Sequence, residues 1–480
     1  YGNLTVNGNG MATTTITGTA GHAIMAVAGA ADIKKATLNG SMGGLINAAG
    51  NVSVADSSIL GGTGDAIMAS PNGNADVTVS NSSLVTSGAG SGNGVVADNR
   101  KAVSVSDTQI RVGGSGIMAD NAASLSVTGS APNGALIVAG QDGIAATGVS
   151  GSVVIRNASI GTGSNGIDIA NASGTADITG TSVTAGGNGI NASGSETDGL
   201  LRITDTSVKA NSGYGIDVSG KSGAVISGLS VTAAGANGTG IVAGAANNLV
   251  LETKSGRNTI TADKTGIDAT GGTAAVIRAN AQQPADTLYI TAGQNDVTGN
   301  GINAGGSSVV SSDVNLSIVT TAEDSNGLNA NGPGSRIAAA KNVAAEVAGN
   351  GANAISATNY SVVTVKGESD LTLRGTDEHG VNAEKGSLVE LAGGSYIKAA
   401  GYGNTAGLYA IDSSKIKAMG ITSIDIATTG DGVGIAANSS DVAVDKIGLF
   451  KVAGDAGATG LYSVNGGHVT AGFASDMEVE

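Results

Sequence analysis

A short phrase of the form Gly-x-Gly-Ile-x-Ala, complete at Gly187–Ala192, recurs from one end of this 480-residue sequence to the other. We call its central aliphatic residue the anchor. The eighteen anchors are Ile24, Ile46, Ile67, Val95, Ile117, Ile144, Ile167, Ile190, Ile216, Ile241, Ile267, Ile302, Leu328, Ile355, Val381, Leu408, Ile435 and Leu461. Successive anchors lie about 26 residues apart on average, a period typical of solenoids, in which each repeat packs against its neighbours. The repeat predicts a single elongated domain over residues 1–480.

Each repeat contains three short segments with the pattern of β-strands. The first is the anchor phrase, as in Gly166–Ile169, where two apolar residues alternate with Asp168 and one face therefore points inward. The second has the pattern Val-x-Val, as at Val77–Val79, and the third centres on one apolar residue, as at Leu84. Three strands in about 26 residues predict one coil of an all-β parallel β-helix with about 18 or more coils, and crossover chirality favours the right-handed form.

Two kinds of corner join the predicted strands. A turn rich in Asn, Asp and Ser, as at Ser80–Ser83, follows the second strand, and these residues tolerate the left-handed backbone conformation. A glycine-rich corner, as at Gly186–Gly189, precedes the next anchor. We expect positive φ angles and close backbone approach at this second corner, because glycine has no Cβ to prevent either.

The composition suits such coils and excludes some partners. Glycine supplies 80 residues and aromatic residues only 2%, so the core must be built from small aliphatic side chains in stacked layers. The net charge of −15 argues against a nucleic-acid partner, which requires a basic surface. The chain has no cysteine, so it contains neither a disulfide nor a cysteine metal site.

Partner binding in a solenoid is expected where the repeat is interrupted, because insertions form loops that often bind partners. The coil after Ile267 is about nine residues too long, and the excess is expected around Asn280–Asp286. We therefore predict partner contacts at Gln282, Gln283 and Asp286.

Tyrosines in the final coils form a second candidate contact surface. They are Tyr396, Tyr402, Tyr409 and Tyr462. Tyr409 and Tyr462 each directly follow an anchor and lie two anchors apart, which places both on the same outer face. An exposed aromatic patch suits contact with a protein, and stacking that stabilises the sheet is the alternative role.

The residues directly after the anchors form a polar column. Its members include Asn47, Asp168, Asn191, Asp217, Asp268, Asn303, Asn329 and Asn382. We predict that this column is a structural polar ladder that solvates or braces one sheet, and the alternative is a row that binds a ligand or calcium. Its carboxylates are separated by amides and apolar residues, so they do not form the oxygen-dense cage that calcium requires.

No residue set predicts catalysis, a cofactor or a metal. The acidic pairs Glu323–Asp324 and Asp377–Glu378 precede anchors, where we expect solvated turns rather than the facing carboxyls of a glycosidase. The three histidines, His22, His379 and His468, lie in distant coils and cannot share a metal. An exposed corner is the expected position of His379.

The alternation of phrases such as Gly187–Ala192 and Gly299–Ala304 with Val-x-Val-x-Asn-Ser phrases such as Val77–Ser82 resembles the passenger domains of pertactin-like bacterial autotransporters. The resemblance covers essentially the whole chain. It implies a right-handed β-helix exported by type V secretion through a C-terminal outer-membrane barrel of a Gram-negative bacterium. The chain is then expected to be an excerpt of a longer precursor that includes a signal peptide and the barrel. The expected location is the cell surface or outer membrane, or the secreted state.

The resemblance also implies a non-enzymatic virulence factor that adheres to host cells or matrix, with a host receptor or matrix protein as partner. One alternative is immune evasion, through binding of a serum regulator of complement or related protease cascades. Self-association in biofilms and polysaccharide-active β-helix enzymes are two others. The sequence lacks the Arg-Gly-Asp tripeptide and the serine-protease motif of some family members, which weakens integrin binding and protease activity respectively.

Overall fold

A computed structural model describes residues 3–8, 15–18, 24–26, 29–40, 45–69, 72–86, 92–169, 172–193, 199–244, 247–256, 258–401, 403–473 and 477–480. Its regular elements are all β-strands. The chain divides into two compact units, Tyr1–Val225 and Ile226–Glu480, and β28 (Gly223–Ser227) lies across their boundary. The single domain expected over residues 1–480 stays a prediction. None of the described residues belongs to a helix with the length and hydrophobicity needed to cross a membrane.

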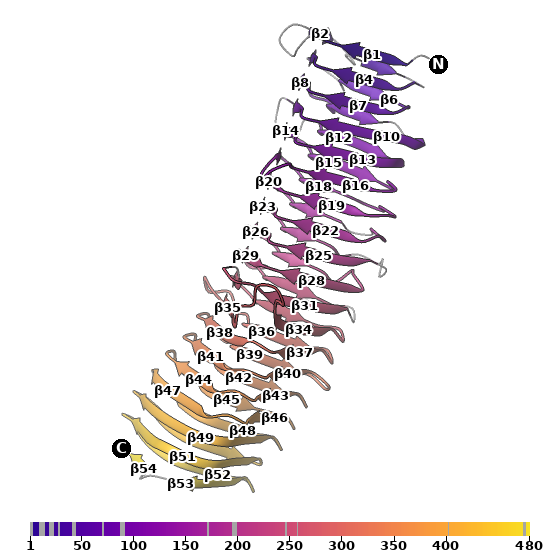
Figure 1. Ribbon diagram of the computed structural model, residues 1–480. Coiled ribbons are helices and arrows are strands. Elements are labelled where there is room, and N and C mark those ends of the chain that lie inside the picture. Colours follow the sequence, from indigo (N-terminus) through magenta and orange to yellow (C-terminus); the bar gives the residue numbers. More distant parts are fainter. Residues whose placement is uncertain are drawn as a thin grey trace. The chain divides into compact units, whose positions relative to one another are not determined.

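The first unit is a stack of three-stranded coils in chain order (Figure 1). Its anchor strands are β3 (Ile24–Ala26), β6 (Ile46–Ala48), β9 (Ile67–Ala69), β12 (Val95–Asp98), β15 (Ile117–Asp120), β18 (Ile144–Ala145), β21 (Ile167–Asp168), β24 (Ile190–Asn191) and β27 (Ile216–Asp217). Its second strands are β1 (Leu4–Asn7), β4 (Ala31–Lys34), β7 (Val52–Ala55), β10 (Asn72–Ser80), β13 (Arg100–Ser106), β16 (Leu125–Thr128), β19 (Val153–Arg156), β22 (Ala176–Thr179) and β25 (Leu200–Thr204). Its third strands are β2 (Thr15–Gly18), β5 (Thr37–Gly40), β8 (Ser58–Leu60), β11 (Ser83–Val85), β14 (Gln109–Val112), β17 (Ala135–Ala139), β20 (Ala158–Thr162), β23 (Ser182–Ala185) and β26 (Ser207–Ala210).

The second unit has the same coil, with longer strands toward its end. Its anchor strands are β30 (Ile241–Ala243), β33 (Ile267–Ala269), β36 (Ile302–Gly305), β39 (Leu328–Asn331), β42 (Asn353–Thr358), β45 (His379–Ala383), β48 (Thr405–Ile411), β50 (Asp431–Asn438) and β52 (Gly457–Val464). Its second strands are β31 (Asn248–Thr253), β34 (Ala274–Ala279), β37 (Val309–Ser312), β40 (Arg336–Ala339), β43 (Val362–Val365), β46 (Leu388–Leu391) and β53 (His468–Phe473). Its third strands are β29 (Leu229–Ala233), β32 (Asn258–Ala262), β35 (Thr287–Ala292), β38 (Asn315–Thr320), β41 (Val343–Val347), β44 (Ser369–Leu373), β47 (Ser395–Gly401) and β54 (Met477–Val479). The long strands β49 (Lys415–Thr428) and β51 (Asp441–Gly454) each combine a second and a third strand.

Equivalent residues of successive coils pair in parallel. In the first unit, Ile190 pairs with Ile167 on one side and with Ile216 on the other, and Val77 pairs with Val103. This register confirms the predicted parallel β-solenoid with three-stranded coils of about 26 residues. The right-handed sense of the coil stays a prediction.

The core is a set of aliphatic columns that run from coil to coil. Anchors such as Ile190 and Ile302 are fully buried, and so are Val-x-Val residues such as Val77 and third-strand residues such as Leu84. Burying one such side chain stabilises a protein by about 1.5–3 kcal/mol. Because each residue packs against its equivalents above and below, the columns favour strict register between coils.

The corners confirm one expectation and correct another. Asn81 (φ 45°) and Asn157 (φ 51°) adopt the left-handed conformation, as predicted for the Asn-rich turn. The positive φ angles expected at Gly186–Gly189 are wrong, because none of these glycines has one. The close approach is confirmed, since a Cβ on Gly189 would lie 2.1 Å from the inward-pointing Val208 of the next coil.

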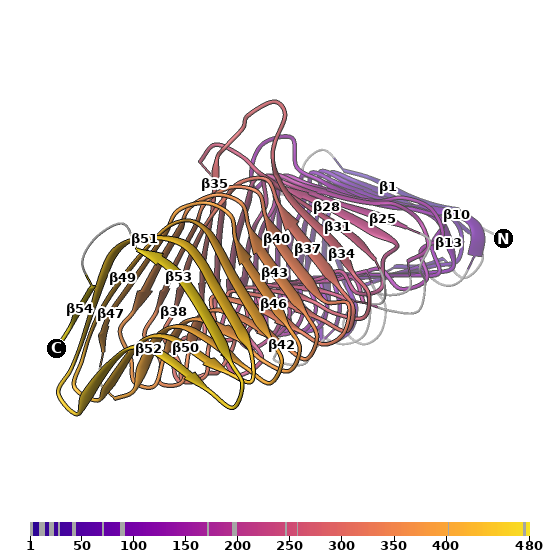
Figure 2. The same cartoon turned by 90° about the horizontal axis from the view of Figure 1, so that it is seen from below.

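The oversized coil of the second unit projects a loop. Seven of the nine extra residues lie between the starts of β34 and β35, and two lie between β35 and β36. Residues 280–286 form most of the excess, and Figure 2 shows this loop extending beyond the neighbouring coils beside β35. The predicted position of the insertion is confirmed.

Candidate functional site

The polar column after the anchors is a hydrogen-bonded ladder. In the second unit, Nδ2 of Asn303 donates to Oδ1 of Asp268 (2.7 Å), and Nδ2 of Asn329 donates to Oδ1 of Asn303 (2.9 Å). In the first unit, Nδ2 of Asn191 donates to Oδ1 of Asp168 (3.2 Å). Asp168 and Asp268 therefore each receive an amide donor from the next coil, and the predicted structural role is confirmed for these members.

A second ladder, two residues before the anchors, was not recognised in the sequence. Nδ2 of Asn326 donates to Oδ1 of Asn300 (2.9 Å), and Nδ2 of Asn353 donates to Oδ1 of Asn326 (2.8 Å). The ladder continues to His379, whose Nδ1 lies 2.9 Å from Oδ1 of Asn353. Alignment of the coils on their anchors reveals this column, because Asn or Asp recurs at the same offset.

The second ladder leads to a cavity of about 240 Å³ over β45, β48, β50 and β52. The lining residues are His379, Asn404, Thr405, Ala406, Tyr409, Asp431, Val433, Ala436 and Tyr462. A small residue, Ala436, lies between Tyr409 and Tyr462 in the sheet, because it pairs with Tyr409 on one side and with Tyr462 on the other. The cavity thus lies where the polar columns give way to aromatic and small side chains.

Aromatic rings stand on two sides of this cavity. The rings of His379 and Tyr409 are stacked, with centroids 4.6 Å apart and planes at 25°. Tyr462, two coils from Tyr409 in register, is 47% exposed. The prediction that Tyr409 and Tyr462 share one outer face is confirmed.

The electrostatic environment of the cavity is negative. Burial lowers the pKa of His379 to about 4, against the opposing effect of Glu384 and Asp377, so the ring is neutral at physiological pH. Burial raises the pKa of Tyr409, and the charges of Glu384 and Asp412 raise it further. The expectation that His379 occupies an exposed corner is wrong, because its ring packs against Tyr409 and the Asn ladder.

An acidic group lies at the rim of the cavity. Asp431 is exposed, and its backbone N–H donates to Oδ1 of Asn404 (3.2 Å), while the backbone N–H of Asn404 donates to Oδ1 of Asp377 (2.9 Å). Within the described part of the chain, the carboxylate of Asp431 forms no ion pair. Its charge is therefore available to a ligand.

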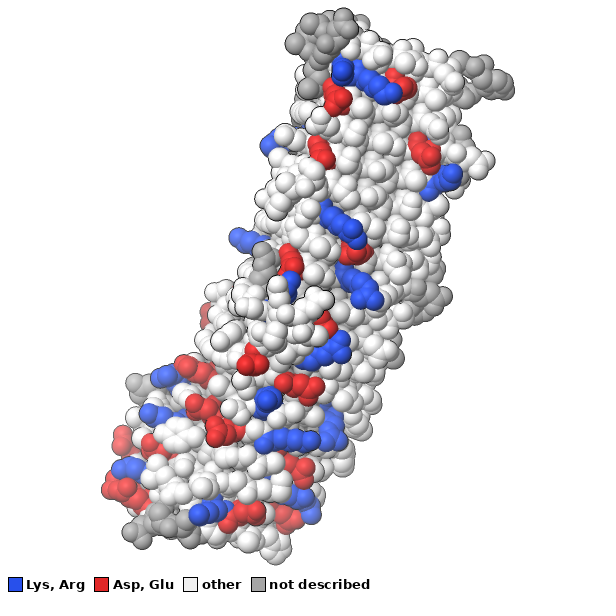
Figure 3. Space-filling view, in the orientation of Figure 1, with Lys and Arg blue, Asp and Glu red and all other residues white. Residues whose placement is uncertain are grey.

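Several charged side chains elsewhere in the second unit form ion pairs between coils. Figure 3 shows acidic and basic residues interspersed over the final coils on the visible face. Arg374 pairs with Glu346 (2.6 Å), Lys417 pairs with Glu390 (3.1 Å), and Lys415 pairs with Asp441 (3.1 Å). These exposed pairs contribute little each, and they leave no uniform charged patch on this face. Unlike the acidic members of these pairs, Asp431 forms no ion pair among the described residues.

Glu378 is a buried acid, so its expected place in a solvated turn is wrong. Its side chain is fully buried, and neither carboxyl oxygen has a hydrogen-bond partner among the described residues. Burial raises the pKa of Glu378 to about 8, an effect that the nearby backbone of Gly375 only partly offsets. Asp377, by contrast, is exposed, as are both members of the Glu323–Asp324 pair.

The positions of Asp377 and Glu378 bear on the glycosidase-like alternative. Asp377 has a left-handed backbone (φ 56°), and the two carboxyls point apart, one into solvent and the other into the core. This pair cannot flank a glycosidic bond. His468 is exposed, His22 lies outside the described residues, and no cluster of three potential metal ligands occurs within the described ranges.

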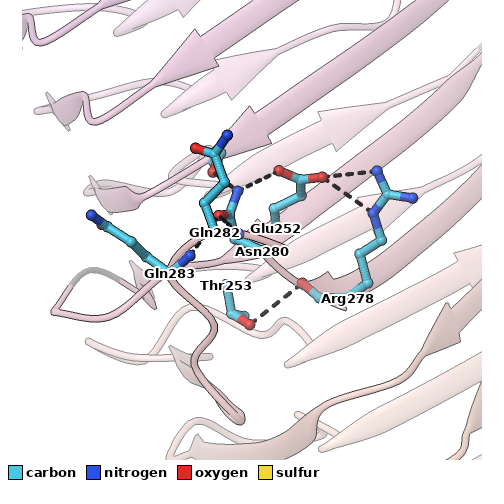
Figure 4. A network of polar contacts seen from close by, with 7 residues as sticks. Glu252, Thr253, Arg278, Asn280, Gln282 and Gln283 are labelled. Carbon is cyan, nitrogen blue, oxygen red and sulfur yellow. Dashed lines mark hydrogen bonds and ion pairs between the residues drawn. The ribbon is translucent and has the colours of Figure 1, made fainter.

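The predicted loop contacts are held by a polar network, shown in Figure 4. Asn280 donates from Nδ2 to Oε2 of Glu252 (2.8 Å), and Glu252 also pairs through Oε1 with Arg278 (2.8 Å). Oδ1 of Asn280 accepts the backbone N–H groups of Gln282 (3.0 Å) and Gln283 (3.1 Å). The backbone of the loop is thereby fixed, and both glutamines are exposed.

Of the remaining predicted residues, Asp286 and Tyr396 do not line the cavity. Asp286 is exposed, and its backbone carbonyl accepts a hydrogen bond from the backbone N–H of Asn315 (2.7 Å) in the next coil. Tyr396 is 38% exposed on β47, beside Asp370, and therefore belongs to another face than Tyr409. Tyr402 lies outside the described residues. Among the described tyrosines, Tyr396 does not share a patch with Tyr409 and Tyr462.

Two buried cations in the first unit are structural. The guanidinium of Arg100 donates to the carbonyl oxygens of Ala48 and Gly50, each at 2.8 Å, and the ammonium of Lys221 donates to the carbonyl of Ala172. Both side chains are at most 2% exposed. They satisfy backbone acceptors at corners and are not accessible to a ligand.

No known protein family matches the sequence, and neither a curated protein nor a solved structure is similar to the chain.

Proposed function

We propose that the chain is a non-enzymatic passenger domain of a pertactin-like autotransporter, exposed at a bacterial surface, where it adheres to host cells or matrix. The sequence resemblance suggests the class, and the parallel solenoid is consistent with it. A solenoid of this kind presents a long ordered surface and needs no catalytic centre to act as an adhesin.

One observation carries the binding part of the proposal. Through the regular coils, polar side chains are engaged with their equivalents in the next coil, as at Asn303 and Asn329. At the cavity this order ends, and Tyr462 and Asp431 are exposed beside a hollow with mostly small residues at its floor. Exposed aromatic groups beside such a hollow are typical of protein contacts.

The acidic composition favours a partner with a basic surface. The net charge is −15, and charge complementarity chiefly accelerates association and weakens as salt screens it. We expect the binding to decrease steadily as sodium chloride is added. Binding that is unchanged by salt would indicate a purely apolar contact.

The test is direct binding of the purified chain to cultured host cells, to a panel of purified matrix proteins and to serum. The proposal expects saturable binding to cells or to a matrix protein, whereas heat-denatured chain should not bind specifically. Capture of a complement or protease regulator from serum, with no adhesion, would favour immune evasion instead. Cleavage of a polysaccharide in a parallel panel, or an absence of all binding, would overturn the proposal.

A further inference from the structure

The cavity beside β48 and β52 combines aromatic faces with an acidic rim. Two tyrosines stand on either side of Ala436, and His379 is held against Tyr409 as a neutral ring. Among the described residues, the lining contains one carboxylate, that of Asp431, and no lysine or arginine. Such a site attracts cations, because aromatic faces carry partial negative charge that adds to that of the carboxylate.

We propose that this cavity binds an arginine side chain of a protein partner, with the guanidinium between Tyr409 and Tyr462 and paired with Asp431. The inference rests on the proposed function only for the source of the arginine, which is a host protein. Arginine suits the site better than lysine, because its planar group stacks on rings and donates two parallel hydrogen bonds to a carboxylate.

The spacing of the two tyrosines agrees with one such guest. They occupy equivalent positions on strands that are two apart, and neighbouring strands are separated by about 4.8 Å. A guanidinium above Ala436 would therefore lie about 5 Å from Tyr409 and about 5 Å from Tyr462. Cation–π attraction operates within about 6 Å. The alanine leaves this space open, since a long side chain there would fill it.

Residues around the cavity orient its aromatic rings and keep its charge favourable for a cation. Nδ1 of His379 lies 2.9 Å from Oδ1 of Asn353, so the Asn ladder fixes the ring that stacks on Tyr409. The neutral state of His379 avoids a competing positive charge inside the site. Glu384 and Asp412 lie near enough to affect the pKa of Tyr409, and their negative potential also favours a cationic guest.

The test uses small probes so that no host partner is needed. The arginine residue analogue N-acetyl-arginine amide is titrated into the whole chain while the ring protons of His379 are followed by NMR. The chain has three histidines, and the His379→Gln variant identifies the signal. The matched probe is N-acetyl-citrulline amide, which has the same planar shape without the charge. We expect the arginine probe to shift the His379 signal with a dissociation constant in the millimolar range, and citrulline to shift it little.

Variants locate the binding. Tyr462→Ala should weaken the arginine probe about tenfold by removing one face, and Asp431→Asn about two- to fivefold by removing the ion pair. Tyr289→Ala is the control, because Tyr289 is 53% exposed on β35, away from the cavity. It should leave the affinity unchanged.

Three outcomes overturn the inference. Equal binding of citrulline means that stacking alone is recognised, and a response to methyl glucosides but not to arginine identifies a carbohydrate site. No response to the arginine probe, while the chain still binds host protein, refutes this site without refuting adhesion. Binding of the probe by a chain that adheres to nothing supports the site and refutes the proposed function.

Discussion

Replacing Glu378 by glutamine should change how the stability of the chain depends on pH. The side chain is fully buried without a hydrogen-bond partner among the described residues, and burial raises its pKa from 4.5 to about 8. The unfolded chain releases this proton near pH 4.5, whereas the folded chain retains it to about pH 8. The stability is therefore fully present below pH 4.5 and is lost progressively as the pH rises through 8.

His379 has the opposite effect and defines the useful window. Burial lowers its pKa from 6.5 to about 4, so its contribution is complete above pH 6.5 and is lost as the pH falls toward 4. Between pH 4.5 and 6.5 the two contributions largely cancel. Above pH 6.5 the change in the contribution of Glu378 dominates, and linkage gives a loss on the order of 1–2 kcal/mol between pH 6.5 and pH 8.

Urea unfolding followed by circular dichroism measures this loss at the two pH values. The free energy of unfolding should fall with urea concentration at the same slope at both pH values. A shift in the midpoint of urea unfolding then reports a change in stability alone. Glu378→Gln keeps the shape of the side chain without the titration, and it should remove most of the decrease. The control is Glu368→Gln, which alters an exposed carboxyl and should retain the decrease. A wild-type chain equally stable at both pH values, or a variant with the same decrease, would refute the protonated buried state.

Three further changes test the coil itself. Asn326→Ala removes the centre of the second ladder and should lower the free energy of unfolding by about 1–3 kcal/mol in the same urea assay. Gly301→Ala places a Cβ 2.3 Å from Ile318 and should cost at least about 1–3 kcal/mol, whereas Gly161→Ala, with open space around it, should cost much less. Asn280→Ala frees the loop before β35, so limited proteolysis should cut it sooner, and an unchanged rate would show that the backbone contacts suffice.

The coil was predictable because its signal is repeated. A spacing of about 26 residues recurs at eighteen anchors, and three apolar segments per period admit few other folds. Of the two reasons predicted for glycine at Gly186–Gly189, close backbone approach is confirmed and positive φ is wrong. Close approach to Val208 requires glycine at Gly189, whereas the backbone there turns without a positive φ. Sequence composition alone does not separate these two requirements.

The candidate site was predictable only in part. The shared face of Tyr409 and Tyr462 follows from their equal offset from the anchor. The burial of Glu378 was missed because an Asp-Glu-His sequence looks like a solvated turn. Its offset from the anchor is that of Ala352 and Thr405, both buried, so alignment of the coils carries the missing signal. The stacking of His379 depends on side-chain orientation, which periodicity does not determine.

We expect partners to bind at the cavity between Tyr409 and Tyr462, where the polar columns give way to aromatic and small side chains. Hydrogen exchange measured by mass spectrometry, with and without a host protein identified by the adhesion panel, tests it most directly. We expect slower exchange in Thr405–Ile411, Asp431–Asn438 and Gly457–Val464 when the partner binds. Protection confined to the regular coils of the first unit, with these three strands unchanged, would contradict it.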